Sequence, residues 1–215
     1  MKQTIAVIDY GMGNVRSVTK ALEHVAPEAQ VLLTSDTQQI EQADKVVFPG
    51  QGAMRDCMAE LTARGLRAAV SQAAATRPFL GICIGEQMLF EHSEEFDTPG
   101  LGILPGTVTR FPQDKMMDAR GNRLKVPHMG WNEVWQNRPH PLWHGIDNGA
   151  RFYFVHSYHV TTTGTELITG ESDYPYRFTC AVGRANLFAT QFHPEKSHTA
   201  GLRLLSNFVA WNGQA

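Results

Sequence analysis

The stretch Phe79–Gln87, with the sequence FLGICIGEQ, joins a short apolar run to a cysteine that has a glycine two positions away on each side. The apolar run is typical of a buried strand, and the segment after Cys83 favours a helix that contains 87–90. Two interpretations fit this spacing. Either a small thiol packs in the core between glycines that leave room for it, or a sharp turn exposes a nucleophile at the end of a strand. Motifs elsewhere in the chain distinguish them.

Strand and helix patterns alternate through the first half of the chain. Apolar residues recur at helical spacing over 15–25 and again over 61–73, where Gly65 favours a break. Short apolar runs between these segments predict strands at 5–8, 31–33, 46–48 and 79–82. Alternation of this kind predicts right-handed crossovers and a parallel sheet with helices on both faces.

The second half of the chain is richer in strand patterns. Short runs of this type predict strands at 107–111, 133–135, 151–155, 166–169, 178–182 and 187–191. Turn residues at 183–186 favour an antiparallel hairpin between the last two. A final helix is expected near His198–Trp211, with Ser197 as its N-cap. We therefore expect a single α/β domain over residues 1–215, with a mixed, largely parallel sheet and an antiparallel C-terminal part.

The composition argues against several classes of protein. The 215 residues carry a net charge of −2, which argues against the basic surface that binds a nucleic-acid backbone. No stretch approaches the ~20 apolar residues that a membrane-spanning helix needs. The first apolar run ends in Asp9-Tyr10-Gly11 rather than in a small-residue cleavage site, so we interpret it as a strand and not as a signal peptide. A cytoplasmic location is expected.

The cysteines and histidines do not form a metal-binding pattern. Cys57, Cys83 and Cys180 are widely spaced and odd in number. This argues against a disulfide framework or a zinc site and favours a reducing compartment with a free thiol. His156 and His159 are three residues apart in an apparent strand, where that spacing puts them on opposite faces. No metal ion is therefore expected.

Gly-x-Cys-x-Gly between a strand and a helix has the same form as the Gly-x-Ser-x-Gly nucleophile elbow. A side chain at Gly81 or Gly85 would clash with the adjacent strand or helix. Cys83 would then stand at a helix N-terminus, where backbone N–H groups and the helix dipole favour its thiolate. The N–H of Ile84 would point to where an oxyanion forms.

The segment QFHPEKS, Gln191–Ser197, ends another strand with a histidine and a carboxylate. Imidazole can take and return a proton near neutral pH, as a thiol nucleophile requires. Pro194 favours an extended backbone at His193, so His193 and Glu195 are expected to project to the same side. A carboxylate that orients a histidine is the arrangement of a catalytic triad, and a plain strand-to-helix turn is the alternative.

Two glycine-rich turns follow other strands. FPGQGA, Phe48–Ala53, could turn backbone N–H groups into a pocket as a second oxyanion donor, or it could be a plain turn. Gly11 and Gly13 form part of a dinucleotide-binding fingerprint, and Asp36 lies where the fingerprint has an acid, but Arg16 replaces the third glycine. A non-catalytic nucleotide-binding module is the function that this partial pattern would support.

Together, PGQG at 49–52, GICIGEQ at 81–87 and HPE at 193–195 resemble the motif set of the class I, or triad, glutamine amidotransferases. Further segments resemble one subfamily, the glutaminase subunits of imidazole glycerol phosphate synthase: DYGMGNVRSV at 9–18, PHMGWN at 127–132 and FVHSYH at 154–159. The resemblance covers essentially the whole chain. It implies a three-layer α/β sandwich around the mixed sheet.

The resemblance also implies residue roles. Cys83 matches the nucleophile, His193 the general base and acid, and Glu195 the residue that orients it. The positions that match substrate-binding residues, with the backbone N–H groups of Gly52 and Ile84 as the oxyanion hole, are Gly50, Gly52, Ile84, Gln87, His156, Ser157 and Tyr158. A partner protein is expected to contact Asn14, Trp131, Tyr158 and Lys196.

An enzyme of this kind hydrolyses L-glutamine to glutamate and ammonia through a cysteine thioester, without a metal or an organic cofactor. The ammonia would pass to a (β/α)8 cyclase subunit, in a heterodimer that makes imidazole glycerol phosphate for histidine biosynthesis. A glutaminase of another biosynthetic synthase and a partner-independent cysteine hydrolase are the alternatives.

The chain departs from the family pattern at Gln51, where a small apolar residue is expected, and at Glu86, where methionine is more usual. Gln51 leaves the resting conformation of the oxyanion strand open.

Overall fold

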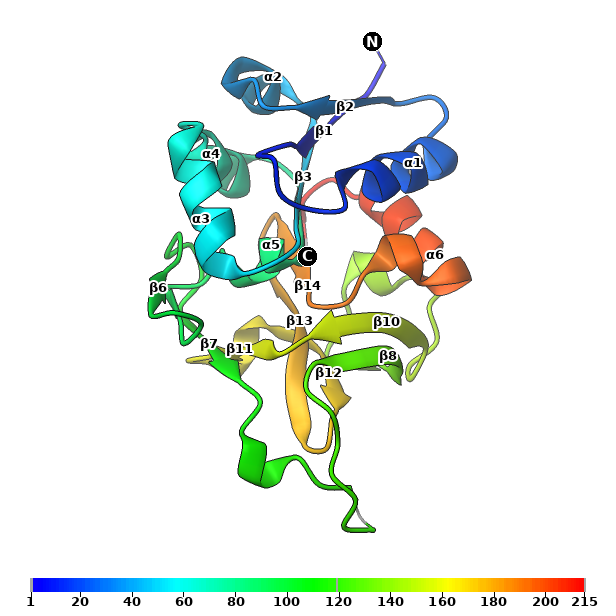
Figure 1. The fold of residues 1–215 in the computed structure, drawn as a ribbon. Helices are drawn as coiled ribbons and strands as arrows, with labels where there is room; N and C mark the ends of the chain where they lie inside the picture. Colours follow the sequence, from blue (N-terminus) through cyan, green and yellow to red (C-terminus); the bar gives the residue numbers. More distant parts are fainter. Residues whose placement is uncertain (1, 119, 215) are drawn as a thin grey trace.

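The computed structural model describes residues 2–118 and 120–214 (Figure 1). The strands are β1 (Thr4–Ile8), β2 (Gln30–Thr34), β3 (Lys45–Gly50), β4 (Phe79–Cys83), β5 (His92–Ser93), β6 (Thr98–Pro99), β7 (Gly106–Arg110), β8 (His128–Glu133), β9 (Trp135–Gln136), β10 (Arg151–His156), β11 (Tyr158–Thr162), β12 (Ile168–Asp173), β13 (Arg177–Arg184) and β14 (Leu187–Thr190). The α-helices are α1 (Val15–Val25), α2 (Thr37–Gln42), α3 (Met54–Ala63), α4 (Arg67–Thr76), α5 (Ile84–Gln87) and α6 (His198–Ala210). Short 3-10 turns are η1 (Gln113–Lys115), η2 (Pro141–Trp143), η3 (Thr165–Leu167) and η4 (Pro194–Lys196).

Most of the strands form one 12-stranded mixed sheet in the order β2-β1-β3-β4-β14-β13-β11-β7-β5-β6, with β12 also beside β13 and β9 beside β12. From β2 to β14 all neighbours are parallel, whereas β13 pairs antiparallel with β14, β11 and β12. Strands β8 and β10 form a separate antiparallel pair. The prediction of an α/β fold with a largely parallel sheet and an antiparallel C-terminal part is confirmed.

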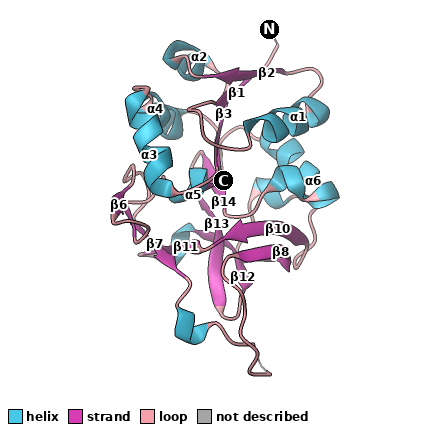
Figure 2. Cartoon of the chain, viewed as in Figure 1, coloured by secondary structure: helices cyan, strands magenta, loops and turns pink. Residues whose placement is uncertain are grey.

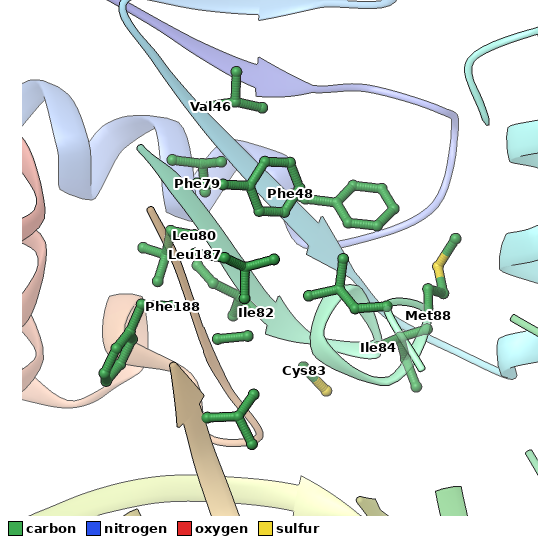
Figure 3. Close-up of a cluster of buried hydrophobic side chains, with 14 of the residues drawn as sticks. Val46, Phe48, Phe79, Leu80, Ile82, Cys83, Ile84, Met88, Leu187 and Phe188 are labelled. Carbon is green, nitrogen blue, oxygen red and sulfur yellow. The ribbon is translucent and has the colours of Figure 1, made fainter. Parts of the chain in front are cut away.

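Helices cover both faces of the parallel strands, which gives the predicted layers. Helices α1 and α6 pack together on one face, and α3 and α4 lie on the other (Figures 1 and 2). Every residue of β3 and β4 is buried, because a parallel strand covered on both faces meets no water. Figure 3 shows the resulting apolar cluster, in which Phe48 and Phe79 come from adjacent strands and Cys83 lies at its lower edge.

The strand order brings the predicted motifs to one edge of the sheet. In the registers of β3, β4 and β14, Gly50 pairs with Cys83, and Ile82 pairs with Thr190. The three motifs that follow these parallel strands therefore leave the sheet side by side. This is the edge at which open α/β sheets bind ligands.

Several local predictions need correction. The helix expected over 87–90 ends at Gln87, because the N–H groups of Leu89 and Phe90 bond to carbonyls three residues back and tighten the chain into a turn. The strand expected at 133–135 is divided between β8 and β9, with Val134 bonded to Ala150 instead. The strand expected at 166–169 begins as η3 and continues as β12.

Two further corrections concern polar residues. Ser197 precedes α6, but its hydroxyl donates to the His193 carbonyl at 2.6 Å and does not cap the helix. His156 and His159 belong to different strands, because the chain breaks its strand pairing at Ser157.

Candidate active site

Cys83 is the strained residue that the elbow requires. Its backbone has φ 57° and ψ −114°, a conformation that costs about 1–3 kcal/mol and persists only where the surroundings enforce it. A Cβ added to Gly85 would lie 1.8 Å from the Phe48 carbonyl oxygen, so only glycine fits there. At Gly81 the clash is milder, with the nearest atom, Ala189 Cβ, at 3.0 Å. The elbow is therefore held by the close approach of β3 to α5.

The Pro-Gly-Gln-Gly turn packs directly against this elbow. A Cβ on Gly50 would lie 2.6 Å from the Tyr10 hydroxyl and 2.8 Å from the Gly85 nitrogen. Gly52 has φ +104°, which favours glycine. Gly52 and Ile84 both line the cavity beside Cys83, whereas Gly50 packs against Gly85 and Tyr10 and is not among the lining residues.

His193 and Glu195 form a buried ion pair beside the cysteine. His193 Nδ1 is 2.8 Å from Glu195 Oε1, and Asn14 Nδ2 donates to the same oxygen at 3.3 Å. The expected extended backbone is not found, because Pro194–Lys196 forms the 3-10 turn η4, but the two side chains still meet. The contact of Asn14 with Glu195 was not predicted.

The electrostatics of this pair suit proton transfer. Burial lowers the pKa of His193, but the neighbouring Cys83 charge and the Glu195 carboxylate outweigh it and raise the pKa to about 10. His193 Nε2 is buried and bonds to no nitrogen or oxygen of the described residues. It is therefore free to exchange a proton with Cys83, which lines the same cavity.

A cavity of about 280 Å³ joins these groups. The predicted residues that line it are Gly52, Cys83, Ile84, Gln87, His156, Ser157, Tyr158 and His193. Four other lining residues were not among the predicted substrate-binding residues, namely Gln51, Glu95, Pro127 and Val155. Glu95 adds a carboxylate to the cavity wall, and its Oε2 accepts a hydrogen bond of 2.6 Å from the Met54 N–H. No motif pointed to Glu95, which lies between two short strands.

The predicted partner contacts lie near this edge but differ in their surroundings. Trp131 lies on β8, is 37% exposed and stacks on His198 with ring centroids 5.1 Å apart. The Lys196 ammonium lies 5.9 Å from the Tyr153 ring centroid. Met129, next but one to Trp131, is 63% exposed and borders a second cavity of about 510 Å³ that shares Pro127 with the first.

The described residues also bear on the expectations about metals, membranes and nucleotides. Within 2–118 and 120–214, no group of three or more His, Cys, Asp or Glu side chains is arranged to hold a metal ion. In the same part of the chain, no helix has the length and apolar character needed to cross a bilayer. Asp36, the acid of the partial nucleotide fingerprint, instead caps α2 by accepting from the backbone of Gln38 and Gln39.

Known proteins were compared with the chain as a whole. The sequence model described as "Glutamine amidotransferase class-I" matches residues 6–211. The chain belongs to the class-I glutamine amidotransferase family. Relatives named imidazole glycerol phosphate synthase subunit HisH include one from Thiobacillus denitrificans, 66% identical over 99% of this chain and 93% of its own length. Another, from Aromatoleum aromaticum, is 65% identical over 96% of this chain and 98% of its own length.

Solved structures of amidotransferases share the fold at low sequence identity. A glutamine amidotransferase from Thermotoga maritima aligns with a TM-score of 0.64 and 15% identity, over 97% of this chain and 97% of its own. A second structure described as a glutamine amidotransferase aligns with a TM-score of 0.70 and 18% identity, over 96% and 97% of the two chains. These alignments support the amidotransferase fold, which the sequence motifs had implied.

Proposed function

We propose that the chain is the glutaminase subunit of an imidazole glycerol phosphate synthase. It hydrolyses L-glutamine to glutamate and ammonia, and a cyclase subunit consumes the ammonia in histidine biosynthesis. The relatives that share about two thirds of its sequence carry the name of this subunit. The observation that carries the proposal is the strained Cys83 beside the buried His193–Glu195 pair in one cavity.

The reaction is an acyl transfer in which each triad residue has one task. The Cys83 thiolate adds to the side-chain carbonyl of glutamine, and backbone N–H groups at Gly52 and Ile84 stabilise the oxyanion. His193 then gives its proton to the departing ammonia, which leaves a γ-glutamyl thioester on Cys83. His193 next takes a proton from water, which attacks the thioester and releases glutamate. Glu195 holds the imidazole and stabilises its charged form.

The cavity wall also suits the polar ends of glutamine. The Glu95 carboxylate provides a negative charge for the α-ammonium group, and its Oε2 bond to the Met54 backbone fixes it in place. Gln87, His156, Ser157 and Tyr158 line the remaining wall and are the proposed contacts for the other polar groups.

Ammonia is mostly protonated in neutral water and is then no longer a nucleophile, so the product must reach its acceptor without entering solvent. We propose that a (β/α)8 cyclase subunit docks over the active-site edge and forms a heterodimer. Asn14, Trp131 and Lys196 are its proposed contacts, and the exposed Met129 extends this surface. We further propose that residues 1–215 act as one glutaminase domain in the cytoplasm.

The test is glutamate release by the isolated chain and by the chain with the cyclase and its nucleotide ligand. We expect slow hydrolysis alone and much faster hydrolysis in the complex. Cys83→Ala should abolish glutamate release while co-purification with the cyclase persists. Wild-type turnover by Cys83→Ala would refute the catalytic assignment. Equal turnover with and without the cyclase, or hydrolysis of unrelated amides and esters, would favour a partner-independent hydrolase.

A further inference from the structure

Gln191 lies beside the nucleophile, where its amide joins Cys83 to Gln87, and it has no role in the mechanism above. It follows β14 and is fully buried. Its Nε2 lies 3.7 Å from Cys83 Sγ, and its Oε1 accepts a hydrogen bond of 2.8 Å from Gln87 Nε2. Its backbone N–H donates to the Cys180 carbonyl at 2.9 Å. Gln191 is therefore held by its backbone N–H group and by both ends of its side-chain amide.

The neighbouring groups decide which way each amide faces. The Tyr158 carbonyl lies 3.3 Å from the Gln87 amide, and because a carbonyl only accepts, the Gln87 nitrogen must face it. That nitrogen also donates to Gln191, so Gln191 presents its oxygen to Gln87 and its N–H group to Cys83. The Gln87 oxygen is left buried without a partner among the described residues, on a side chain that lines the cavity.

A pair of neutral histidines fixes the Tyr158 carbonyl. His156 Nδ1 lies 2.8 Å from this carbonyl oxygen, and His156 Nε2 lies 2.9 Å from His128 Nδ1. Burial, helped by the neighbouring His128, lowers the pKa of His156 well below its usual value, and burial lowers the pKa of His128 to about 4. A neutral His156 has one N–H, which donates to Tyr158, so its Nε2 must accept from His128. The N–H donors in this series of hydrogen bonds therefore all point one way, from His128 to His156 and from His156 to the Tyr158 carbonyl.

We propose that Gln191 is a positioning residue that stabilises the Cys83 thiolate with its N–H group and turns the Gln87 carbonyl oxygen toward an N–H group of the substrate. This inference rests on the proposed role of Cys83 as nucleophile. An amide suits the first task because it donates to a charged sulfur without adding a charge of its own. His193 therefore stays the group that exchanges the proton. The second task follows because Gln191 and Tyr158 occupy the Gln87 nitrogen.

The test measures alkylation of Cys83 by iodoacetamide from pH 5 to 10, read by mass spectrometry of the peptide that contains it. The peptides of the buried Cys57 and Cys180 are internal references in the same samples. Gln191→Met keeps the length of the side chain and removes both hydrogen bonds. Gln191→Glu keeps an oxygen that accepts from Gln87 but replaces the N–H group that faces the sulfur. Thr169→Val, which removes another buried polar group, is the matched control.

We expect the pH of half-maximal Cys83 alkylation to rise by about one unit in Gln191→Met, the effect of losing one donor to a charged acceptor. It should rise further in Gln191→Glu, whose carboxylate also adds a negative charge beside the sulfur. It should stay unchanged in Thr169→Val. The KM for glutamine should rise in Gln191→Met and change little in Gln191→Glu, because only the former releases Gln87. A purely structural role would lower thermal stability without moving the alkylation profile.

Profiles of both Gln191 variants that superimpose on the wild type would overturn the proposal. If Gln191→Met does not fold, Gln87→Leu decides, because it removes the bond that orients Gln191 and should also raise the alkylation midpoint. A wild-type chain that hydrolyses no glutamine in the complex would refute the proposed function instead, and the alkylation profiles would still report on Gln191.

Discussion

Removing the carboxyl group of Glu86 should make the protein's stability less dependent on pH. Glu86 follows the elbow on α5, is fully buried, and neither of its oxygens has a hydrogen-bond partner among the described residues. Burial, reinforced by the charge of Cys83, raises the pKa of Glu86 well above its usual 4.5. The folded state therefore holds Glu86 protonated, and this neutral form does not oppose a thiolate at Cys83.

The sign and size of the effect follow from linkage. Because the folded-state pKa is raised, the stability from this group is complete below pH 4.5 and is lost as pH rises toward the folded-state value. The loss is at most about 1.4 kcal/mol per pH unit, or at most about 2 kcal/mol between pH 6.0 and 7.5. With an m-value of about 3 kcal/mol per molar urea, this is a shift of at most about 0.7 M in the unfolding midpoint.

The assay is urea unfolding of the wild type and of Glu86→Gln at pH 6.0 and 7.5, at constant ionic strength. The variant should gain stability relative to the wild type by up to about 2 kcal/mol over this range, since it has no proton to lose. Glu23→Gln, at an exposed position on α1, is the control for removing one carboxyl group. Glu86→Met, which removes the buried polar atoms at similar volume, should be more stable than the wild type at pH 7.5. A wild-type-minus-variant difference that is the same at both pH values would refute the reasoning.

Three further perturbations test the elbow, the triad and the docking surface. Gly85→Ala should lose more than about 4 kcal/mol or fail to fold, because its Cβ would lie 1.8 Å from the Phe48 carbonyl oxygen; a thermal melt near that of the wild type would contradict this. Glu195→Gln should lower kcat by at least about a hundredfold. The alkaline limb of this variant's pH–rate profile should also move to lower pH, because one cause of the raised His193 pKa is gone. An unchanged profile would count against the ion pair. Trp131→Ala should weaken binding of the cyclase about tenfold and leave Cys83 alkylation unchanged. A wild-type affinity in a calorimetric titration would show that Trp131 is not part of the interface.

The sequence was informative wherever backbone geometry restricts residue type. The unbroken apolar runs at 46–48 and 79–82 predicted buried parallel strands, and both are buried along their whole length. The need for glycine at position 85 was predicted from steric grounds alone, and the close approach of Gly85 to β3 supports that reasoning. The helix α2 was missed because it is short and because Asp36, its N-cap, also matched part of a nucleotide fingerprint.

The residues that support the site could not be predicted in the same way, because their contacts depend on which strands become neighbours. Gln191 reaches Cys83 only because β14 pairs with β4, although the two residues are 108 positions apart in the sequence. Asn14 reaches Glu195 from the loop after β1 across 181 positions. An amide places no steric demand on its own backbone, so no local pattern marks it. A nucleophile at a strained turn can thus be found from sequence, whereas the hydrogen bonds that orient it follow from the order of strands in the sheet.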